Sequence, residues 1–188
     1  MFISKIRLTM IKKVYLSLII ATLILLSSCN NNAKTQSVKM KTVEKVDLNR
    51  YLGEWYEIAR FNHSFEKGLV GVTATYTLKG NGKIDVLNQG YKDSLNGTLK
   101  RAKGFAKIPN PNEPGRLKVY FFWPFGGEYL ILDLDENYQN VLIGTSSKKY
   151  MWILSRTPHM DDLTYNKLIE KANSLGFDTS KLIKVPQK

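Results

Sequence analysis

Cysteine is nearly absent from this chain of 188 residues: Cys29 is the only one, so the folded protein cannot form an intramolecular disulfide. Long apolar runs are missing too. The run from Val14 to Leu26 spans 13 residues and is too short for an ordinary membrane-spanning helix. Stability must therefore come from a hydrophobic core, which roughly 140 folded residues can supply as a single domain.

The patterns of common catalytic and metal sites are also missing. Only two histidines occur, His63 and His159, and neither belongs to an H-E-x-x-H or other clustered metal pattern. No G-x-S-x-G or Walker-type loop is found. The two S-x-x-K matches, which begin at Ser64 and Ser146, fall in turn-like segments without their partner motifs. The sequence therefore predicts a protein that is not an enzyme and that uses no metal and no cofactor.

The N-terminal segment has the features of an export signal. Two lysines precede the apolar run, and two small serines directly precede Cys29. This arrangement resembles a bacterial lipobox. The resemblance implies that residues 1–28 are removed as a signal peptide and that Cys29 becomes the lipid attachment site, with a diacylglycerol on its sulfur and an acyl chain on its amine. The alternative is a buried structural cysteine.

Residues 29–45 are polar and lack a sustained period, which predicts a lipidated N-terminus followed by a flexible linker. Asn30 directly after the cysteine is not acidic and leaves transfer to the outer membrane open. Processing would remove four of the 28 basic residues and none of the 16 acidic ones, which leaves a net charge of +8. For an exported, lipid-anchored protein this charge favours a membrane surface over nucleic acid as the anionic partner.

Beyond the linker, apolar and polar residues alternate with a period of two within segments bounded by turn residues. This pattern predicts antiparallel strands with one buried face. The strand-like runs are Glu54–Phe61, Val72–Leu78, Lys83–Tyr91, Thr98–Ile108, Arg116–Phe121, Glu128–Leu134, Tyr138–Thr145 and Tyr150–Thr157. Eight short strands joined by short turns suggest an up-and-down barrel or a two-sheet sandwich, and a closed barrel has no exposed edges.

A helical period follows the strands. The apolar positions are Tyr165, Leu168, Ile169, Ala172 and Leu175, with Asp161 and Asp162 near the start and Gly176 after the end. We expect this amphipathic helix to pack on the outside of the barrel; a membrane-surface helix is the alternative. A short final strand is expected over Lys181–Val185.

Two segments carry a resemblance to the lipocalin family. Residues 47–60, with a G-x-W core at Gly53 and Trp55, resemble the first lipocalin signature. Residues 152–158 resemble the third, whose essential residue is the arginine, here Arg156. The second signature is only partly matched, because Asp135 and Tyr138 stand as D-x-x-Y where the family has a T-D-Y triplet.

The similarity spans roughly residues 46–186 and is most specific to bacterial outer-membrane lipoprotein lipocalins and their apolipoprotein D-like relatives. It implies an all-β domain over residues 46–188: an eight-stranded antiparallel up-and-down barrel with a C-terminal α-helix packed on its outside. It further implies that the protein is anchored to the outer membrane and binds, stores or transports fatty acids, lysophospholipids or similar amphiphiles. A lipid hydrolase of the cell envelope, or a structural lipoprotein with a filled barrel, is the alternative.

The resemblance implies that Trp55 closes the barrel floor and that Arg156 lies across it. Side chains two apart on a strand point the same way, so an inward-facing Trp55 predicts that Glu57 and Ala59 also face inward. In the same way, an inward-facing Arg156 predicts that Leu154 and Trp152 face inward. The resemblance adds Tyr129, an aromatic residue on a neighbouring strand. The expected ligand-binding residues are Trp152, Tyr129, Glu57, Ala59 and Leu154. Ordinary core packing is the alternative for each.

Glu57 and an aromatic cluster near residues 121–125 can each be interpreted in two ways. A carboxylate in an apolar cup must be paired, hydrated or protonated, so Glu57 either binds a ligand's polar head or joins a buried network. Phe121, Phe122, Trp123 and Phe125 form an aromatic cluster at a connection between strands. It is either a barrel lip that touches lipid or a loop folded over its own core.

Overall fold

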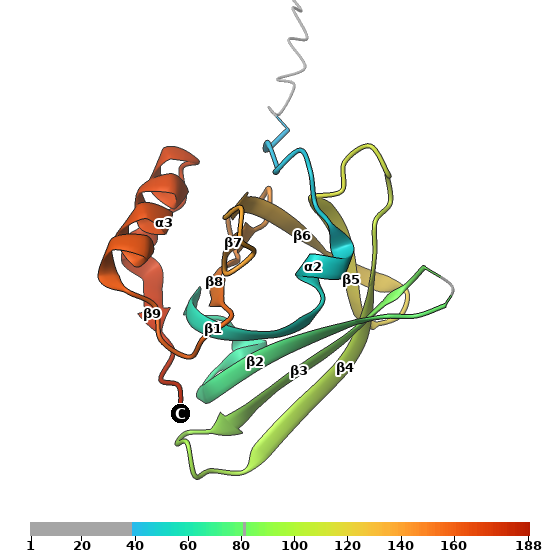
Figure 1. Cartoon of the computed structure of the whole chain (residues 1–188). Helices are drawn as coiled ribbons and strands as arrows, with labels where there is room; N and C mark the ends of the chain where they lie inside the picture. Colours follow the sequence, from blue (N-terminus) through green and yellow to red (C-terminus); the bar gives the residue numbers. More distant parts are fainter. Residues whose placement is uncertain (1–38, 81) are drawn as a thin grey trace, which may run out of the picture. The chain divides into compact units, whose positions relative to one another are not determined.

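Nine strands form one antiparallel sheet, and the first eight close into a barrel (Figure 1). The computed structural model describes residues 39–80 and 82–188, so the predicted signal peptide and Cys29 lie outside the described residues. The strands are β1 (Gly53–Phe61), β2 (Leu69–Leu78), β3 (Ile84–Lys92), β4 (Leu99–Lys107), β5 (Arg116–Phe122), β6 (Phe125–Leu134), β7 (Asn140–Gly144), β8 (Met151–Ser155) and β9 (Leu182–Lys184).

The barrel closes because β1 pairs on both of its edges. It pairs with β2 in the register Trp55 to Ala74 and with β8 in the register Glu57 to Leu154. Every other strand from β2 to β8 pairs with its sequence neighbours. The prediction of an up-and-down barrel is therefore confirmed, and the sandwich alternative is wrong. Strand β9 adds only to the end of β1.

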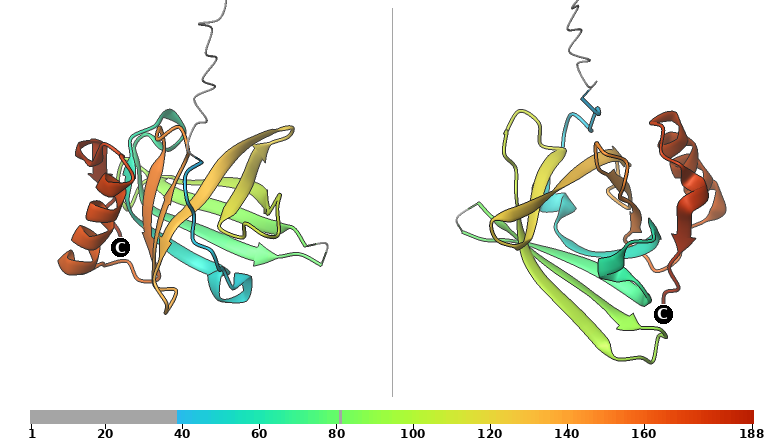
Figure 2. Two further views of the ribbon diagram at one scale, coloured as in Figure 1. Left: turned by 90° about the horizontal axis from the view of Figure 1, so that it is seen from above. Right: turned by 180° about the vertical axis from the view of Figure 1, so that it is seen from behind.

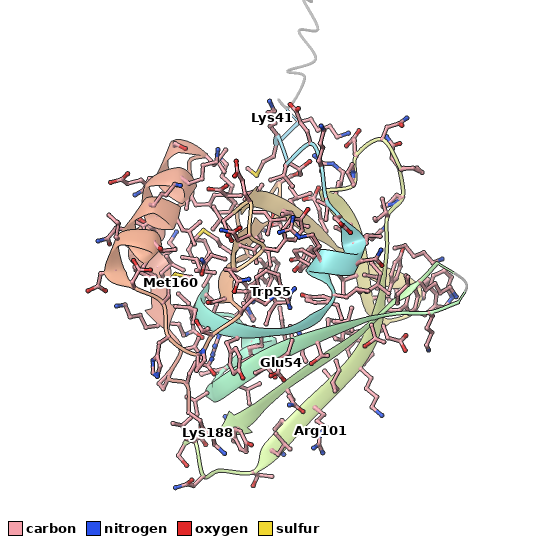
Figure 3. The ribbon with its side chains drawn as sticks, viewed as in Figure 1. Lys41, Glu54, Trp55, Arg101, Met160 and Lys188 are labelled. Carbon is pink, nitrogen blue, oxygen red and sulfur yellow. The ribbon has the colours of Figure 1, made fainter. Side chains whose placement is uncertain are left out.

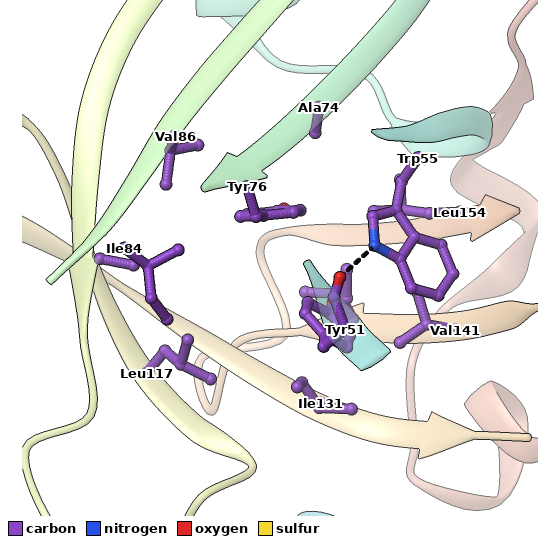
Figure 4. Close-up of a cluster of buried hydrophobic side chains, with 12 residues drawn as sticks. Tyr51, Trp55, Ala74, Tyr76, Ile84, Val86, Leu117, Ile131, Val141 and Leu154 are labelled. Carbon is purple, nitrogen blue, oxygen red and sulfur yellow. Dashed lines mark hydrogen bonds between the residues drawn. The ribbon is translucent and has the colours of Figure 1, made fainter. Parts of the chain in front are cut away.

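The two faces of the sheet bury two separate cores. The inner core fills part of the barrel and is made of Tyr51, Trp55, Ala74, Tyr76, Ile84, Val86, Ala106, Leu117, Ile131, Val141, Ile143 and Leu154 (Figure 4). The outer core lies between the barrel wall and the C-terminal helix and is made of Ala59, Phe61, Leu130, Leu132, Leu142, Met151, Ile153, Leu168, Ala172 and Phe177. Met40–Lys188 thus contains every strand of the described residues and both cores, and it forms one compact unit.

Helix α3 (Asp162–Ser174) lies against the outside of the barrel, as predicted (Figures 1 and 2). The Asp161 side chain accepts a hydrogen bond from the backbone N–H of Thr164 and caps its first turn. Leu168 and Ala172 are buried in the outer core, whereas Leu163 on the other side is 83% exposed. No helix among the described residues is long and apolar enough to cross a membrane.

The last part of the predicted linker is packed rather than flexible. The backbone N–H of Val43 donates to the carbonyl of Ile131 at 3.0 Å, and Val43 packs against the inner core. Met40 packs against the outer core, and its carbonyl accepts from the Arg116 guanidinium at 2.8 Å. The prediction of a linker up to residue 45 is therefore wrong from Met40 onward, because these isolated apolar side chains find places on the barrel.

The prediction that Ala59 faces the barrel interior is wrong as well. The β1–β8 register shifts between Glu57 and Ala59, which is a β-bulge. The bulge adds one residue, so the alternation of side chains inverts after it. Ile58 and Ala59 both pack toward the outer core, and Arg60 then points back inside, where it pairs with Glu57.

One end of the barrel is closed by Trp55 and Arg156, as predicted, and we call this end the floor. The Trp55 side chain is fully buried inside the ring of strands (Figures 3 and 4), and its Nε1 donates to the Tyr51 carbonyl at 2.9 Å. The Arg156 guanidinium carbon lies 3.8 Å from the centroid of the Trp55 ring. The guanidinium also donates to five backbone carbonyls, those of Arg50, Tyr51, Leu52, Glu54 and Tyr138.

Four of these carbonyls lie in or just after the short helix α2 (Leu48–Tyr51), which precedes β1. The Arg156 side chain, just after β8, therefore fixes the start of β1 to the end of β8. Gly53 has φ +95°, a conformation that favours glycine, and a Cβ there would lie 3.4 Å from Arg156 Nη1.

Asp135 and Tyr138, the residues of the partly matched second signature, stabilise the turn between β6 and β7 near the floor. The Asp135 carboxylate accepts hydrogen bonds from the backbone N–H groups of Asn137, Gln139 and Asn140 and so fixes the turn between β6 and β7. The Tyr138 hydroxyl accepts from the backbone N–H of Asp47 at 2.7 Å. A D-x-x-Y arrangement therefore supplies the contacts that hold this turn to the N-terminal segment.

We expect Trp55→Ala to lower the free energy of unfolding by about 3 to 5 kcal/mol, because it removes a large buried ring and leaves a cavity under Arg156. Arg156→Lys should destabilise less, since lysine keeps the charge but loses the planar face and the forked donors. Urea unfolding measures both effects. Trp123→Ala is the matched control, because Trp123 is 69% exposed; equal midpoints for the parent and both floor variants would contradict the proposed floor.

Candidate functional site

The barrel interior is the candidate binding site. Trp152 and Leu154 on β8 face it, as predicted: Leu154 belongs to the inner core and Trp152 packs against it half-buried. Tyr129 on β6 also lies on this inner side. Ala59, the other neutral residue expected here, lies in the outer core instead.

Three tyrosine hydroxyls meet inside the barrel above the floor. The Tyr129 hydroxyl lies 2.7 Å from that of Tyr51 and 2.9 Å from that of Tyr76. Burial raises the pKa of all three hydroxyls above the ordinary value, so the cluster is neutral. It forms a polar spot within an apolar wall, able both to donate and to accept hydrogen bonds.

The wall formed by β3 and β4 carries a small side chain, Ala102, and an unpaired polar atom of Asn88. Asn88 on β3 pairs in register with Ala102 on β4, on the same face as the core residues Ile84 and Ala106, so both point inward. Ala102 is nevertheless exposed to solvent, and it lies on the part of β4 that does not pair with β5. The Asn88 Oδ1 atom is buried and has no hydrogen-bond partner among the described residues. It is a free acceptor for the donor group of a ligand or a water.

The other end of the interior, the mouth of the barrel, holds a buried charge cluster. The Glu57 and Arg60 side chains are 5% and 2% exposed, and Arg60 Nη1 donates to Glu57 Oε1 at 2.6 Å. Arg60 Nη2 donates to the carbonyls of Glu66 and Leu69. Of the two interpretations of Glu57, the structure therefore supports the buried network.

Glu66 fastens the loop between β1 and β2 to this cluster. It lies in the short 3-10 helix η1 (Ser64–Glu66), and its Oε2 accepts from Trp152 Nε1 at 3.1 Å. His63 Nε2 lies 2.9 Å from the same oxygen, close enough for an ion pair but not aligned for a hydrogen bond. The His63 ring stacks on Phe65, with 3.8 Å between ring centroids. Trp152 thus supports the loop as well as facing the interior.

The burial of this cluster changes the acidity of Glu57. Removal from water, with a further contribution from the negative charge of Glu66, raises the pKa of the Glu57 carboxyl to about 8, although Arg60 opposes the shift. The Glu57 carboxyl therefore binds a proton more readily than an exposed carboxyl does.

Neither S-x-x-K match forms a catalytic arrangement. The Ser146 hydroxyl donates to Glu128 Oε1 and fixes the turn between β7 and β8. Ser64 begins the 3-10 helix η1 and is exposed. Within residues 39–80 and 82–188, no group of three or more histidine, cysteine or acidic side chains is placed to hold a metal ion.

Several residues of the interior were not anticipated. Asn88 lies on the inner face of β3, two residues after Val86 and two before Gly90. The alternation of side chains along this strand could therefore have identified Asn88 as an inward-facing polar residue. Tyr76 shares one face of its strand with apolar residues, but the partner of its hydroxyl, on β6, cannot be read from one strand alone. Arg60 lies beyond the bulge, and nothing in the local alternation predicts that it turns inward.

A family model described as a lipocalin-like domain matches residues 46–187, which include all nine strands and both signatures. The chain is a lipocalin. Outer membrane lipoprotein Blc of Vibrio cholerae is 44% identical to it over 166 residues, which are 88% of this chain and 96% of that protein. Apolipoprotein D of Mus musculus is 39% identical over 152 residues, which are 77% and 78% of the two chains.

Solved structures agree on the architecture. The structure of insecticyanin from the tobacco hornworm Manduca sexta superposes on this lipocalin with a TM-score of 0.65 at 21% identity, covering 80% of this chain and 85% of that one. At this level of identity the similarity supports the barrel fold only. Lipocalins are generally binding proteins and not enzymes, which agrees with the prediction from the sequence.

The raised pKa of Glu57 leads to a prediction on stability. Because the folded state keeps a proton that the unfolded state releases, stability should fall as pH rises from about 5 to about 8, by at most ~1.4 kcal/mol per pH unit. Glu57→Gln should remove this component of the pH dependence, and Glu54→Gln, at an exposed position, should leave it in place. Urea midpoints across this pH range test it; the same slope in Glu57→Gln and parent would refute the bound proton.

Proposed function

We propose that this protein is a lipid-anchored outer-membrane lipocalin that binds long-chain amphiphiles, such as fatty acids or lysophospholipids, inside its barrel. The observation that carries the proposal is the combination of an apolar inner wall with a few polar groups. The wall is accessible at Ala102, and its polar groups are the tyrosine cluster and the unpaired oxygen of Asn88. Ligand pockets commonly pair an apolar lining with a small number of placed polar groups.

The ligand would be held mainly by burial of its chain. Each methylene removed from water contributes about 0.8 kcal/mol, so a moderate number of enclosed carbons gives useful affinity without directional contacts. The Tyr129 hydroxyl and Asn88 Oδ1 would select a headgroup that donates a hydrogen bond, such as a protonated carboxyl or a glycerol hydroxyl. Trp152 and Leu154 would contribute apolar contacts on the other side.

Membrane attachment would occur through Cys29. The names of the bacterial relatives describe outer membrane lipoproteins, and Cys29 follows a lipobox-like segment in this chain. Several acyl chains hold a protein at a membrane far more durably than one chain. The barrel would then act at the surface of the membrane that supplies or receives its amphiphile.

Ligand binding is tested by titrating saturated fatty acids and lysophospholipids of increasing chain length into the soluble segment that begins at Met40. We expect saturable binding whose affinity rises with chain length, by up to ~0.8 kcal/mol per methylene. Ala102→Trp should reduce affinity at least tenfold because it fills the accessible interior. Lys103→Trp, whose side chain points outward on the same strand, should not.

The headgroup contact is tested with Tyr129→Phe, which should weaken binding only of ligands whose headgroup reaches the hydroxyl. Binding that is absent, or that shows no dependence on chain length and no response to Ala102→Trp, would reject the carrier function and favour a structural lipoprotein with a filled barrel. Conversion of the added lysophospholipid to new products would instead indicate a hydrolase.

The anchor is tested with Cys29→Ser. This change removes the thiol that accepts the lipid, so the variant should remain unprocessed or appear as an unacylated form. Membrane fractionation and the intact mass of the product measure the outcome. A variant with the parent's acylated mass and membrane fraction would show that Cys29 is not the attachment site.

A further inference from the structure

The hairpin turn between β5 and β6 exposes three aromatic side chains. Phe122 is 80% exposed, Trp123 69% and Phe125 80%. None of them belongs to the inner or the outer core, whereas Phe121 beside them packs against the inner core. Of the two interpretations of this cluster, folding over its own core therefore applies to Phe121 alone. Contiguous exposed apolar surface of this kind marks a contact site.

The aromatic surface continues from the turn onto the outer wall of the barrel. The rings of Phe105 on β4 and Tyr120 on β5 stack with 4.9 Å between their centroids. The Trp123 ring lies 5.5 Å from that of Tyr120 and 6.3 Å from that of Phe105. We call the whole surface the aromatic–lysine face; it consists of Phe105, Tyr120, Phe122, Trp123, Phe125, Lys83, Lys107 and Lys118.

The lysines surround the rings. Lys107 Nζ lies 5.6 Å from the centroid of the Trp123 ring, and Lys118 Nζ lies 5.8 Å from that of Tyr120. Lys83 Nζ lies 5.3 Å from the centroid of Phe105. These lysines place positive charge within and around an aromatic surface, which is the arrangement suited to an anionic partner.

The acids beside this face are paired with other cations. Asp85, opposite Phe105 in the sheet, pairs with Lys79 at 2.8 Å, and Glu128 pairs with Arg116 at 2.7 Å. Among the described residues, Lys107 and Lys118 form no ion pair. The positive charges of Lys107 and Lys118 are therefore not neutralised by an ion pair within the part of the chain that the structure describes.

We propose that the aromatic–lysine face docks onto the headgroup region of an anionic phospholipid bilayer. Aromatic side chains are enriched where apolar and aqueous regions of a membrane meet, because one part of the ring system is apolar and the other polar. Lysines near a membrane surface are attracted to anionic headgroups. Exposed rings framed by lysines satisfy both requirements at one surface.

The length of the chain before the barrel permits this contact together with the anchor, a step that rests on the lipid attachment in the proposed function. The carbonyl of Met40 accepts from Arg116, the first residue of β5, and Phe122 is six residues along that strand, roughly 20 Å away. The eleven Cα–Cα steps from Cys29 to Met40 can span at most about 40 Å. An acylated Cys29 and the face can therefore reach one membrane surface.

Anchoring makes a weak docking surface effective. A tether of this length holds the face at a high effective concentration near the membrane, so the second contact needs little intrinsic affinity. The β5–β6 turn lies at the end of the barrel opposite the Trp55 floor, because β5 starts at the floor end and β6 returns to it. Docking would bring a wall beside the mouth against the bilayer from which an amphiphile can transfer.

The experiment uses the soluble segment from Met40 to Lys188 and sedimentation of sucrose-loaded vesicles, made of phosphatidylcholine alone or with one quarter phosphatidylglycerol. We expect the parent to partition at least tenfold more strongly onto the vesicles that contain phosphatidylglycerol. The triple variant Phe122→Ser, Trp123→Ser, Phe125→Ser should lose at least tenfold of that partitioning. Lys107→Glu with Lys118→Glu should abolish the preference for phosphatidylglycerol.

Matched controls come from helix α3, which lies on another part of the surface. Leu163→Ser removes an apolar side chain that is 83% exposed, and Lys167→Glu with Lys171→Glu changes the net charge by the same amount as the lysine variant on the face. Neither control should change partitioning by more than about twofold. Urea midpoints equal to the parent's confirm that the triple variant is folded, since its three side chains lie outside both cores.

Three outcomes overturn the proposal: no binding of the parent to either vesicle, equal binding of parent and triple variant, or equal effects of the face and control charge reversals. Analytical ultracentrifugation adds one more, since a dimer that the triple variant loses would assign the face to a second copy of the chain. In the acylated protein in vesicles, chain-brominated lipids should quench Trp123 emission, and Trp123→Phe should remove that quenching. Fatty-acid titration of the same variants separates failure of docking from failure of the proposed binding function.

Discussion

The contact between Arg156 and Trp55 is the constraint on which the rest of the structure depends. The Arg156 guanidinium stacks on a fully buried ring and donates to four carbonyls of the segment that begins the barrel and to one carbonyl in the turn between β6 and β7. Arg156 follows β8 and the first segment precedes β1, so this contact spans about one hundred residues. Because it closes one end, the interior can be open to solvent elsewhere without losing its shape.

The bulge in β1 determines which side chains at the end of that strand face the barrel interior and which face helix α3. It turns Ala59 toward helix α3 while Glu57 and Arg60 both point inward. Without the extra residue, strict alternation would place Arg60 in the apolar outer core with no partner, which would be costly. Inside, the arginine binds Glu57 and the loop carbonyls instead. The bulge therefore accounts for both the helix contact and the charge cluster at the mouth.

The inner and outer faces of the barrel wall differ in their side chains and in what they contact. The inner face combines apolar side chains with the neutral tyrosine cluster and Asn88, which suits an amphiphile with a donor headgroup. The outer face of β6, β7 and β8 is covered by α3, whereas the outer face of β4 and β5 remains exposed and carries aromatic rings and lysines. In the proposed arrangement, the outer face of β4 and β5 and the lipid on Cys29 together hold the barrel to the membrane that its ligand comes from.

The local patterns of the sequence were sufficient for the strands, the helix and the floor. Alternation gives the inner and outer faces of each regular strand, and helical spacing with Asp161 before it and Gly176 after it marks α3. The G-x-W core and the later arginine identified Trp55 and Arg156 through their resemblance to the lipocalins, and the structure brings them together.

Contacts between distant segments were decisive for the remainder. The bulge at Ile58 and Ala59 depends on the register with β8, and a period of two cannot reveal where one residue is inserted. The packing of Met40 and Val43 depends on places that other strands provide. The pKa of Glu57 likewise depends on Arg60, which the bulge turns inward, and on Glu66, which the loop between β1 and β2 brings close. Alternation is a property of one strand, whereas burial, pairing and charge depend on what the complete fold places opposite each side chain.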